Sequence, residues 1–306
     1  MEPLIQTLDR IEFSTNPSSA IAKLREAFKT TGFFFLQNHG MDISSICRGE
    51  DSFKQFLTEL SLEKRMAYSF PEKGYQVGYT PPKIETGEFA KVADEKHFFH
   101  VFPDDTPFIM EIPTFKKDTL ELWNQFNNLA EEIMEYTALS IQEFKDFFRS
   151  SDNSKGYSLL RGIHYPAGQK PVDDDEAITE GGNVVGMCAS KHTDINMITL
   201  LLAKEPGLQL WYEGRWIPIT IEDPNLIIVN VGDMLQHLTN GFYKSGLHRV
   251  VCQENKERFS IPFFYHQPID FDIFPLIQFG EPKEKFRFKK AGEFLNYRLK
   301  QLGLIK

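Results

Sequence analysis

The chain has 306 residues, 41% of them hydrophobic, and its 28 phenylalanines supply enough apolar material for one large core. A net charge of -9 disfavours binding to a phosphate backbone, so we expect no nucleic-acid partner. No apolar stretch approaches the roughly 20 residues that a membrane helix needs, and the acidic start does not resemble a signal peptide. We therefore expect a cytoplasmic protein, monomeric and not bound to membranes, that acts on a small molecule.

The N-terminal half of the chain is predicted to be mostly helical. Residues 16–32 begin with cap-type side chains, carry apolar residues at helical spacing and end on a glycine. Residues 33–40 (FFFLQNHG) then predict a short buried strand closed by a turn. Two further helices are predicted, over residues 43–60 and over residues 119–148, where apolar residues recur at helical spacing.

Short β-rich segments follow one another beyond residue 155. Gly, Pro, Asn and Asp separate them, which predicts an antiparallel sandwich or jelly roll, and residues 289–303 predict a closing helix. We therefore expect an α+β protein with a double-stranded β-helix (jelly-roll) core. Its expected divisions are an N-terminal region of helices and a strand (1–115), a long linking helix (116–155), the core (156–268), and a C-terminal tail with a helix (269–306).

A candidate metal site begins with His192 and Asp194 in the segment KHTDIN. Residues two apart on a strand share a face, so the imidazole and the carboxylate would lie side by side. Such a pair alone is typical of a solvated strand end. With His248, at the start of a later apolar segment, it forms the facial triad of two histidines and one carboxylate found in non-haem iron(II) sites. Zinc accepts the same ligands, but no general base for a hydrolytic zinc site is recognisable.

Arg258 and Ser260 form a second candidate site in the segment RFS. They are again two residues apart and would point to one side of a strand. A guanidinium and a hydroxyl together suit the binding of a carboxylate, and a buried arginine needs an anionic partner. For Arg258 alone a structural ion pair explains the pattern equally well; beside the triad, anion binding is the better interpretation.

The segment from residue 161 to about residue 268 resembles the catalytic domain of the iron(II)- and 2-oxoglutarate-dependent dioxygenases, within them the isopenicillin N synthase-like, plant-type branch. The motifs that carry the resemblance are HTDINMITLLL, GLQLWYEGRWIPI, VNVGDMLQHLTNGFYKSGLHRV and RFS. Upstream, GFFFLQNHGM, GYQVGY and ADEKHFFHV are similar to N-terminal and middle segments of the same branch. The resemblance covers nearly the whole chain and rests on an ordered set of motifs. It implies that residues 1–115 are the branch's N-terminal dioxygenase region.

The resemblance implies a role for each matching residue. The implied iron ligands are His192, Asp194 and His248, and the implied ligands of the distal carboxylate of 2-oxoglutarate are Arg258, Ser260 and Tyr165. The expected candidates for the substrate pocket are Phe264, Asn196, Phe99 and His97. The chain departs from the branch at Ile163, His164 and the pair Ile195–Asn196, close to where cosubstrate and substrate are expected.

The resemblance further implies an oxidoreductase that uses iron(II), 2-oxoglutarate and dioxygen, with ascorbate as an accessory reductant. A small-molecule substrate would be hydroxylated, desaturated or cyclised while 2-oxoglutarate is converted to succinate and carbon dioxide. Two alternatives stay open: an iron-dependent oxidase of the same fold that does not use a keto acid, and a non-catalytic jelly-roll binding protein. The net charge disfavours a nucleic-acid demethylase, as does Phe264, where that class carries a second arginine.

Overall fold

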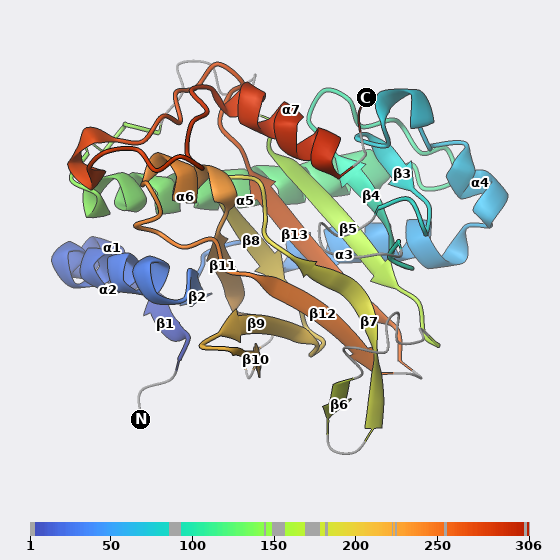
Figure 1. The fold of residues 1–306 in the computed structure, drawn as a ribbon. Helices are drawn as coiled ribbons and strands as arrows, with labels where there is room; N and C mark the ends of the chain where they lie inside the picture. Colours follow the sequence, from blue (N-terminus) through green and yellow to red (C-terminus); the bar gives the residue numbers. More distant parts are fainter. Residues whose placement is uncertain are drawn as a thin grey trace.

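The computed structural model describes residues 4–85, 93–143, 145–148, 157–168, 178–180, 183–221, 223, 225–253, 256–302 and 305. It contains two β-sheets with helices packed around them (Figure 1). In spatial order, the larger sheet consists of β1 (Gln6–Asp9), β2 (Phe33–Gln37), β11 (Ile227–Val231), β8 (Ile198–Leu202), β13 (Arg258–Tyr265), β5 (Leu159–Tyr165), β4 (His97–Val101) and β3 (Gly78–Thr80). The smaller sheet consists of β10 (Arg215–Pro218), β9 (Leu208–Tyr212), β12 (His248–Gln253), β7 (Asn183–His192) and β6 (Ile178–Glu180).

Helices precede, connect and follow the strands. The α-helices are α1 (Arg10–Thr15), α2 (Pro17–Thr30), α3 (Ile43–Lys54), α4 (Leu62–Met66), α5 (Phe115–Ser140), α6 (Asp233–Leu238) and α7 (Ala291–Gln301). A π-helical turn follows α3 (Gln55–Glu59), and short 3-10 turns lie at Pro71–Lys73 and Ile277–Phe279. Within the described ranges, none of the helices combines the length and the apolarity needed to cross a membrane.

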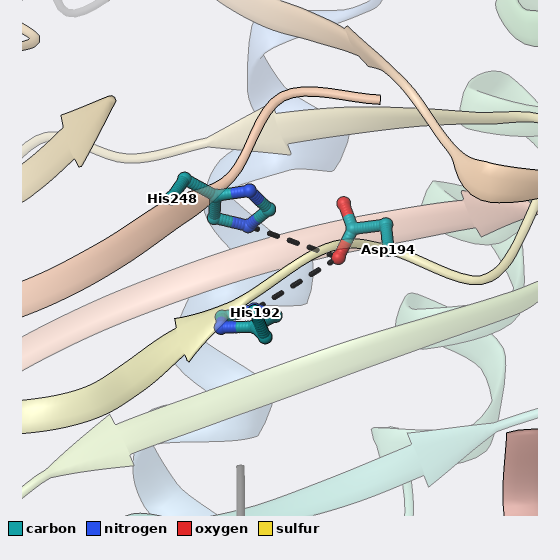
Figure 2. Close-up of side chains that lie close together, drawn as sticks. All are labelled: His192, Asp194 and His248. Carbon is teal, nitrogen blue, oxygen red and sulfur yellow. Dashed lines mark ion pairs between the residues drawn. The ribbon is translucent and has the colours of Figure 1, made fainter. Parts of the chain in front are cut away.

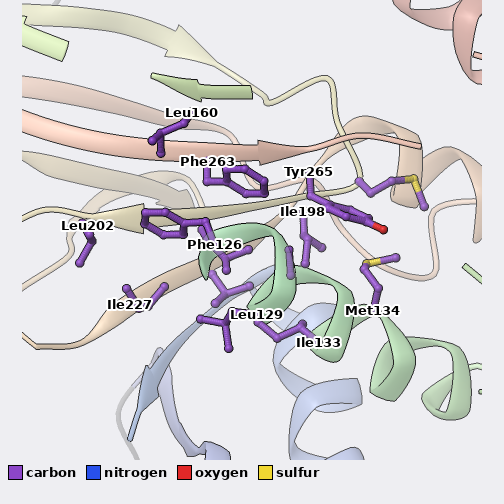
Figure 3. Packing of buried hydrophobic residues seen from close by; sticks show 14 of the residues in the cluster. Phe126, Leu129, Ile133, Met134, Leu160, Ile198, Leu202, Ile227, Phe263 and Tyr265 are labelled. Carbon is purple, nitrogen blue, oxygen red and sulfur yellow. The ribbon is translucent and has the colours of Figure 1, made fainter. Parts of the chain in front are cut away.

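Helix α5 covers one face of the larger sheet and fixes which side of β13 is left for the site (Figures 1 and 3). Successive side chains on a strand point to opposite faces. Phe263 points to the helix, is fully buried, and stacks on Phe126 with the ring centroids 5.6 Å apart and an interplanar angle of 5°. Trp123 meets the same ring edge-on at 5.6 Å. Arg258 and Ser260 point to the other face of β13 than Phe263 does. They therefore face the space between the two sheets.

The N-terminal region extends the larger sheet at both of its edges. At one edge, β2 pairs antiparallel with β11, and β1 pairs in parallel with β2. At the other edge, β4 pairs antiparallel with both β5 and β3. Strands that precede residue 115 are therefore built into the core sheet, and the N-terminal region and the jelly roll share one hydrogen-bonded framework.

The α+β class, the jelly-roll core and the order of helices, strands and closing helix predicted from the sequence are confirmed. The helix predicted over residues 43–60 is present as α3 and the π-helical turn that follows it. The long linking helix predicted over residues 116–155 is wrong in its extent, because α5 ends at Ser140. Gln142 has a φ of 64°, a left-handed value that stops the helix, and the Glu143 N–H donates back to the Ala138 carbonyl. Residues 149–156 lie outside the described part of the chain.

Candidate active site

Two strands of the smaller sheet bring the predicted histidines together. β7 ends at His192, β12 begins at His248, and the two residues are direct partners in the antiparallel register. Asp194 lies two residues beyond the end of β7, where the chain turns towards β8. Figure 2 shows the three side chains pointing towards one another. The fold therefore brings together three residues that the sequence pattern singled out.

The donor atoms of these three side chains converge as metal ligands do. Asp194 Oδ1 lies 3.9 Å from His192 Nε2 and 3.8 Å from His248 Nε2. The three potential ligand atoms all lie within 4.8 Å of one another, and Asp194 and His248 are buried. Two imidazoles and one carboxylate are the ligand set of the facial triad, which leaves the remaining positions of an octahedral iron(II) ion open.

Hydrogen bonds set the orientation of both imidazoles. His192 Nδ1 lies 2.7 Å from the carbonyl oxygen of Ser190, and His248 Nδ1 lies 2.9 Å from that of Gly246. Because a carbonyl oxygen only accepts, each Nδ1 donates its proton, and each Nε2 is left with a lone pair for a metal ion. The backbone of the two ligand-bearing segments therefore selects the ligating tautomer.

Asp194 is oriented by two donors to its second oxygen. Thr199 Oγ1 donates to Asp194 Oδ2 at 2.6 Å and Asn230 Nδ2 donates to it at 2.9 Å, which leaves Oδ1 for the metal ion. Burial would raise the pKa of Asp194, but the neighbouring His248 and His192 and these hydrogen bonds lower it overall. Burial, together with His248, lowers the pKa of His192 to about 4. At neutral pH the site thus offers an anionic carboxylate and a neutral His192 ring, the forms that bind a divalent cation.

A cavity of about 190 Å³ joins the triad to the residues predicted to hold the keto acid. It is lined by His192, Asp194, His248, Tyr165, Arg258 and Ser260, among others. Arg258 is buried, and its Nε donates to the Pro206 carbonyl oxygen at 3.2 Å. Its Nη1 and Nη2 atoms are buried and have no hydrogen-bond partner among the described residues. Because unpaired buried cationic donors are costly, this end of the cavity fits an anionic ligand.

The strand register places two further polar groups beside Arg258. Tyr165 is its direct partner on β5, and the guanidinium carbon of Arg258 lies 5.1 Å from the centroid of the Tyr165 ring. Ser260 follows Arg258 on the same face of β13 and lines the same cavity. A guanidinium, a hydroxyl and a phenol together fit one carboxylate of a dicarboxylic keto acid whose other end faces the triad.

Two of the four predicted substrate-pocket residues line the cavity. Phe264 and Asn196 are both on its wall. Asn196 is almost fully buried, and its Nδ2 donates to the Ile198 carbonyl oxygen at 2.5 Å and to Thr199 Oγ1 at 3.2 Å. Its amide donors therefore hold the turn between the triad and β8, and the side chain supports Thr199, the donor to Asp194.

The other two predicted pocket residues, Phe99 and His97, do not face the cavity, which corrects the prediction. Both lie on the face of β4 that turns towards the helices. Phe99 packs against Phe56 with the ring centroids 4.7 Å apart, and His97 Nε2 lies 2.8 Å from His164 Nδ1. Since side chains alternate along a strand, the neighbours of these residues occupy the cavity side of β4.

Four largely buried charged residues on the cavity wall were not predicted from the sequence. They are Glu85, Asp94, Lys96 and Arg161. The sequence does contain a signal for them: charged residues occur within the β-rich segment LLRGIHY and immediately before the strand in ADEKHFFHV. A charge that is buried with a strand needs a partner, so such residues indicate a buried ion pair.

Helix α7 closes one side of the cavity, which was also not predicted. Leu295, Leu299 and Arg298 from this helix line the wall. Arg298 Nη1 pairs with Asp233 Oδ2, which also accepts from Thr193 Oγ1 at 3.0 Å. The closing helix is thus linked through Asp233 to Thr193, which lies between the triad residues His192 and Asp194.

A jelly roll that holds two histidines and a carboxylate in one cavity defines the class of non-haem iron(II) oxygenases, and the cavity also contains Arg258, whose Nη atoms have no partner among the described residues. The chain belongs to the 2OG-Fe(II) oxygenase superfamily, whose model matches residues 158–267. A second model, described as the N-terminal region of non-haem dioxygenases in morphine synthesis, matches residues 3–124. Membership of this superfamily, whose cofactors are iron(II) and 2-oxoglutarate, confirms the family predicted from the sequence.

Known proteins of similar sequence and structure agree with this assignment. The crystal structure of a 2OG-Fe(II) oxygenase family protein from Caulobacter crescentus is 30% identical, covers 97% of this chain and 98% of its own, and has a TM-score of 0.81. The 2-oxoglutarate-Fe(II) type oxidoreductase hxnY of Emericella nidulans is 29% identical over 288 residues, covering 84% of this chain and 78% of the relative. Codeine O-demethylase of Papaver somniferum is 29% identical over 282 residues, covering 88% of this chain and 72% of the relative.

Proposed function

We propose that this protein oxidises a small organic molecule, with one molecule each of dioxygen and 2-oxoglutarate consumed and succinate and carbon dioxide released. Hydroxylation, desaturation and ring closure are all compatible outcomes for the substrate. The observation that carries the proposal is the buried Arg258, whose Nη1 and Nη2 have no partner among the residues the structure describes and which shares one cavity with the triad. When bound, iron(II) and 2-oxoglutarate supply the activation of dioxygen, and the protein supplies binding and orientation.

Each proposed role follows from a contact within the chain. His192, Asp194 and His248 would hold the iron, since their free donor atoms converge. Arg258 and Ser260 would hold the distal carboxylate of the keto acid through charge-assisted hydrogen bonds, with Tyr165 beside them. The apolar wall of the cavity would exclude water from the reacting groups.

An iron-dependent oxidase that does not use a keto acid is the main competing function. Such an enzyme would not need an anion beside Arg258, and its two orphaned donors would remain unpaired in the buried cavity. The names of the relatives support a keto-acid-dependent reaction on a small molecule: one is a 2-oxoglutarate-Fe(II) type oxidoreductase and another a codeine O-demethylase.

Succinate release coupled to substrate oxidation tests the proposal. A library of small molecules is incubated with the enzyme, iron(II), ascorbate and 2-oxoglutarate, and succinate and product mass are measured together. We expect a substrate that yields succinate and oxidised product in equal amounts. Oxidised product without succinate would support the keto-acid-independent oxidase. Failure to bind iron(II), in an anaerobic titration, would support a non-catalytic binding protein.

A further inference from the structure

Four charged residues of the cavity wall form one connected network of ion pairs, here named the charged wall: Glu85, Asp94, Lys96 and Arg161. Lys96 Nζ lies 2.5 Å from Asp94 Oδ2 and 2.9 Å from Glu85 Oε2. Glu85 also pairs with Arg161, whose Nη1 lies 3.4 Å from each of its oxygens. Each cation therefore has an acidic partner within the wall, and the two carboxylates balance the two cations.

His100 completes the network without adding a charge. Arg161 Nε donates to His100 Nε2 at 2.7 Å, and His100 Nδ1 lies 3.1 Å from the carbonyl oxygen of Gln76. The ring therefore accepts at Nε2 and donates at Nδ1, which is the neutral tautomer. Burial, together with Arg161, lowers the pKa of His100 to about 3, which agrees with this assignment.

The ionised forms of the wall support one another. Burial alone would lower the pKa of Lys96, but Asp94 and Glu85 raise it overall. Burial alone would raise the pKa of Glu85, but Arg161 and Lys96 lower it overall. The wall thus consists of two cationic and two anionic side chains in contact with one another, and their charges sum to zero.

The charged wall is hydrogen-bonded to the strand that carries His192. The Ser190 N–H and hydroxyl donate to Asp94 Oδ1 at 3.3 Å and 3.0 Å. The carbonyl oxygen of the same serine accepts from His192 Nδ1 at 2.7 Å. One residue of β7 thus links the wall to an iron ligand, so a molecule oxidised at the iron would lie against the wall.

Apart from the charged wall, the triad and Arg258, the lining residues include one more charged side chain, Arg298, which pairs with Asp233 Oδ2. The other lining residues are apolar or neutral. Phe264 lines the cavity, and its ring centroid lies 5.2 Å from the Arg161 guanidinium carbon. His266 also lines the cavity; its buried Nδ1 has no hydrogen-bond partner among the described residues. This nitrogen is placed to exchange a hydrogen bond with a ligand.

We infer that the substrate is an electrically neutral molecule with hydrogen-bonding groups, and that the charged wall excludes ions from this part of the cavity. Each charge of the wall already has a partner in Asp94, Glu85, Lys96 or Arg161, so an ionic substrate would either remain unpaired or break an existing pair. The inference rests on the proposed function, because it assigns Arg258, whose Nη atoms have no partner in the described part of the chain, to the keto acid.

Matched ligand triplets test the inference. Each triplet carries a primary carboxamide, a carboxylate or an aminomethyl group on the same ring skeleton. Their dissociation constants are measured anaerobically, from the change in visible absorption of the enzyme with iron(II) and 2-oxoglutarate bound. We expect the carboxamide to bind at least about tenfold more tightly than either ion, because an ion would stay uncompensated in a buried site.

Variants of the wall should move this preference in opposite directions. Glu85→Gln leaves the wall with a net positive charge and should shift the preference towards the carboxylate by about tenfold, whereas Lys96→Met should shift it towards the amine. The double variant Glu85→Gln/Lys96→Met is neutral again and should restore the preference for the carboxamide. Glu95→Gln is the matched control, since it removes a carboxylate from the same segment that is 43% exposed and pairs with Lys83 at 3.1 Å.

Three results would overturn the inference. The wild-type enzyme could bind the carboxylate or the amine more tightly than the carboxamide, the single variants could leave this preference unchanged, or none of the carboxamides could bind. A preparation that develops no 2-oxoglutarate-dependent absorption would instead count against the proposed function. The two failures are therefore distinguishable in one titration series.

Discussion

Asn230 donates from Nδ2 to Asp194 Oδ2 at 2.9 Å, on the carboxylate oxygen that does not face the two histidines. Asn230 belongs to β11 in the larger sheet, whereas the histidines belong to β7 and β12 in the smaller sheet. The orientation of the carboxylate ligand therefore depends on how the two sheets are packed. Groups that orient a ligand in this way usually matter for metal affinity nearly as much as the ligand itself.

Replacing Asn230 by leucine should weaken metal binding without removing a ligand. The variant loses the donor that holds Asp194 Oδ2, so we expect iron(II) affinity to fall by about 10- to 100-fold. Anaerobic calorimetric titration measures the change. Asn225→Ala, in an exposed loop, is the control and should bind iron(II) as the wild type does. An unchanged affinity in Asn230→Leu would show that Thr199 alone orients the carboxylate.

Asp194→Ala should abolish turnover. It removes the anionic member of the triad and leaves two neutral imidazoles, which do not compensate the charge of a divalent cation in a buried site. Succinate release is expected to be undetectable, and iron(II) titration should show no binding. Turnover within about tenfold of the wild type would exclude Asp194 as a ligand.

Arg258→Ala should mainly raise the requirement for 2-oxoglutarate. The loss of a buried charge-assisted pair is expected to weaken keto-acid binding by about 10- to 100-fold, with less effect on iron(II) affinity. Spectral titration with 2-oxoglutarate gives the dissociation constant of the keto acid, and a separate anaerobic titration with iron(II) gives that of the metal ion. Arg48→Ala removes an arginine whose side chain is 44% exposed and should leave them unchanged. If Arg258→Ala binds 2-oxoglutarate normally, the anion site lies elsewhere.

Acid should destabilise the fold through two buried histidines, His97 and His100. Burial lowers the pKa of each from 6.5 to about 3, so both stay neutral in the folded protein, whereas the unfolded chain protonates them below about pH 6.5. Unfolding therefore takes up protons in the pH range between the pKa of each histidine in the folded protein and its pKa in the unfolded chain. The free energy of unfolding should fall as the pH drops, by up to about 1.4 kcal/mol per pH unit for each histidine.

Urea unfolding between about pH 5 and about pH 7 measures this slope. His100→Asn should reduce it, because one of the two proton-binding groups is gone, whatever its effect on stability at neutral pH. An unfolding free energy that is flat or rises on acidification would contradict the assignment of both rings as neutral.

Phe263→Ala should destabilise the packing of α5 on the larger sheet. The ring is fully buried between Phe126 and Trp123, so its removal leaves a cavity and should cost about 3–5 kcal/mol. Phe108→Ala, at a side chain that is 58% exposed, should change stability by less than about 0.5 kcal/mol. Equal effects in the two variants would show that Phe263 is not part of a close-packed core.

The local pattern of the sequence and its ordered motifs were together sufficient to predict the triad and the fold class. His192 and Asp194 are two residues apart beside a strand, and His248 and Arg258 begin apolar strands, so the period of two predicted which residues share a face. The ordered motifs predicted the family and the jelly roll. Residues two apart on a strand are constrained by backbone geometry alone, which is why the pairs His192–Asp194 and Arg258–Ser260 needed no tertiary information, whereas His248 was added from the ligand set of the triad and the family motifs.

Only the tertiary structure showed which residues line the substrate side of the cavity. Every residue of β4 is buried, so no alternation of polar and apolar residues revealed that Phe99 and His97 face the helices. Arg161 lies far from Glu85 and Lys96 in the sequence and comes beside them because β4 pairs with β5, which makes Arg161 the direct partner of His100. Contacts between distant segments depend on strand order and sheet packing, and that is the physical reason why the charged wall became apparent only in the folded chain.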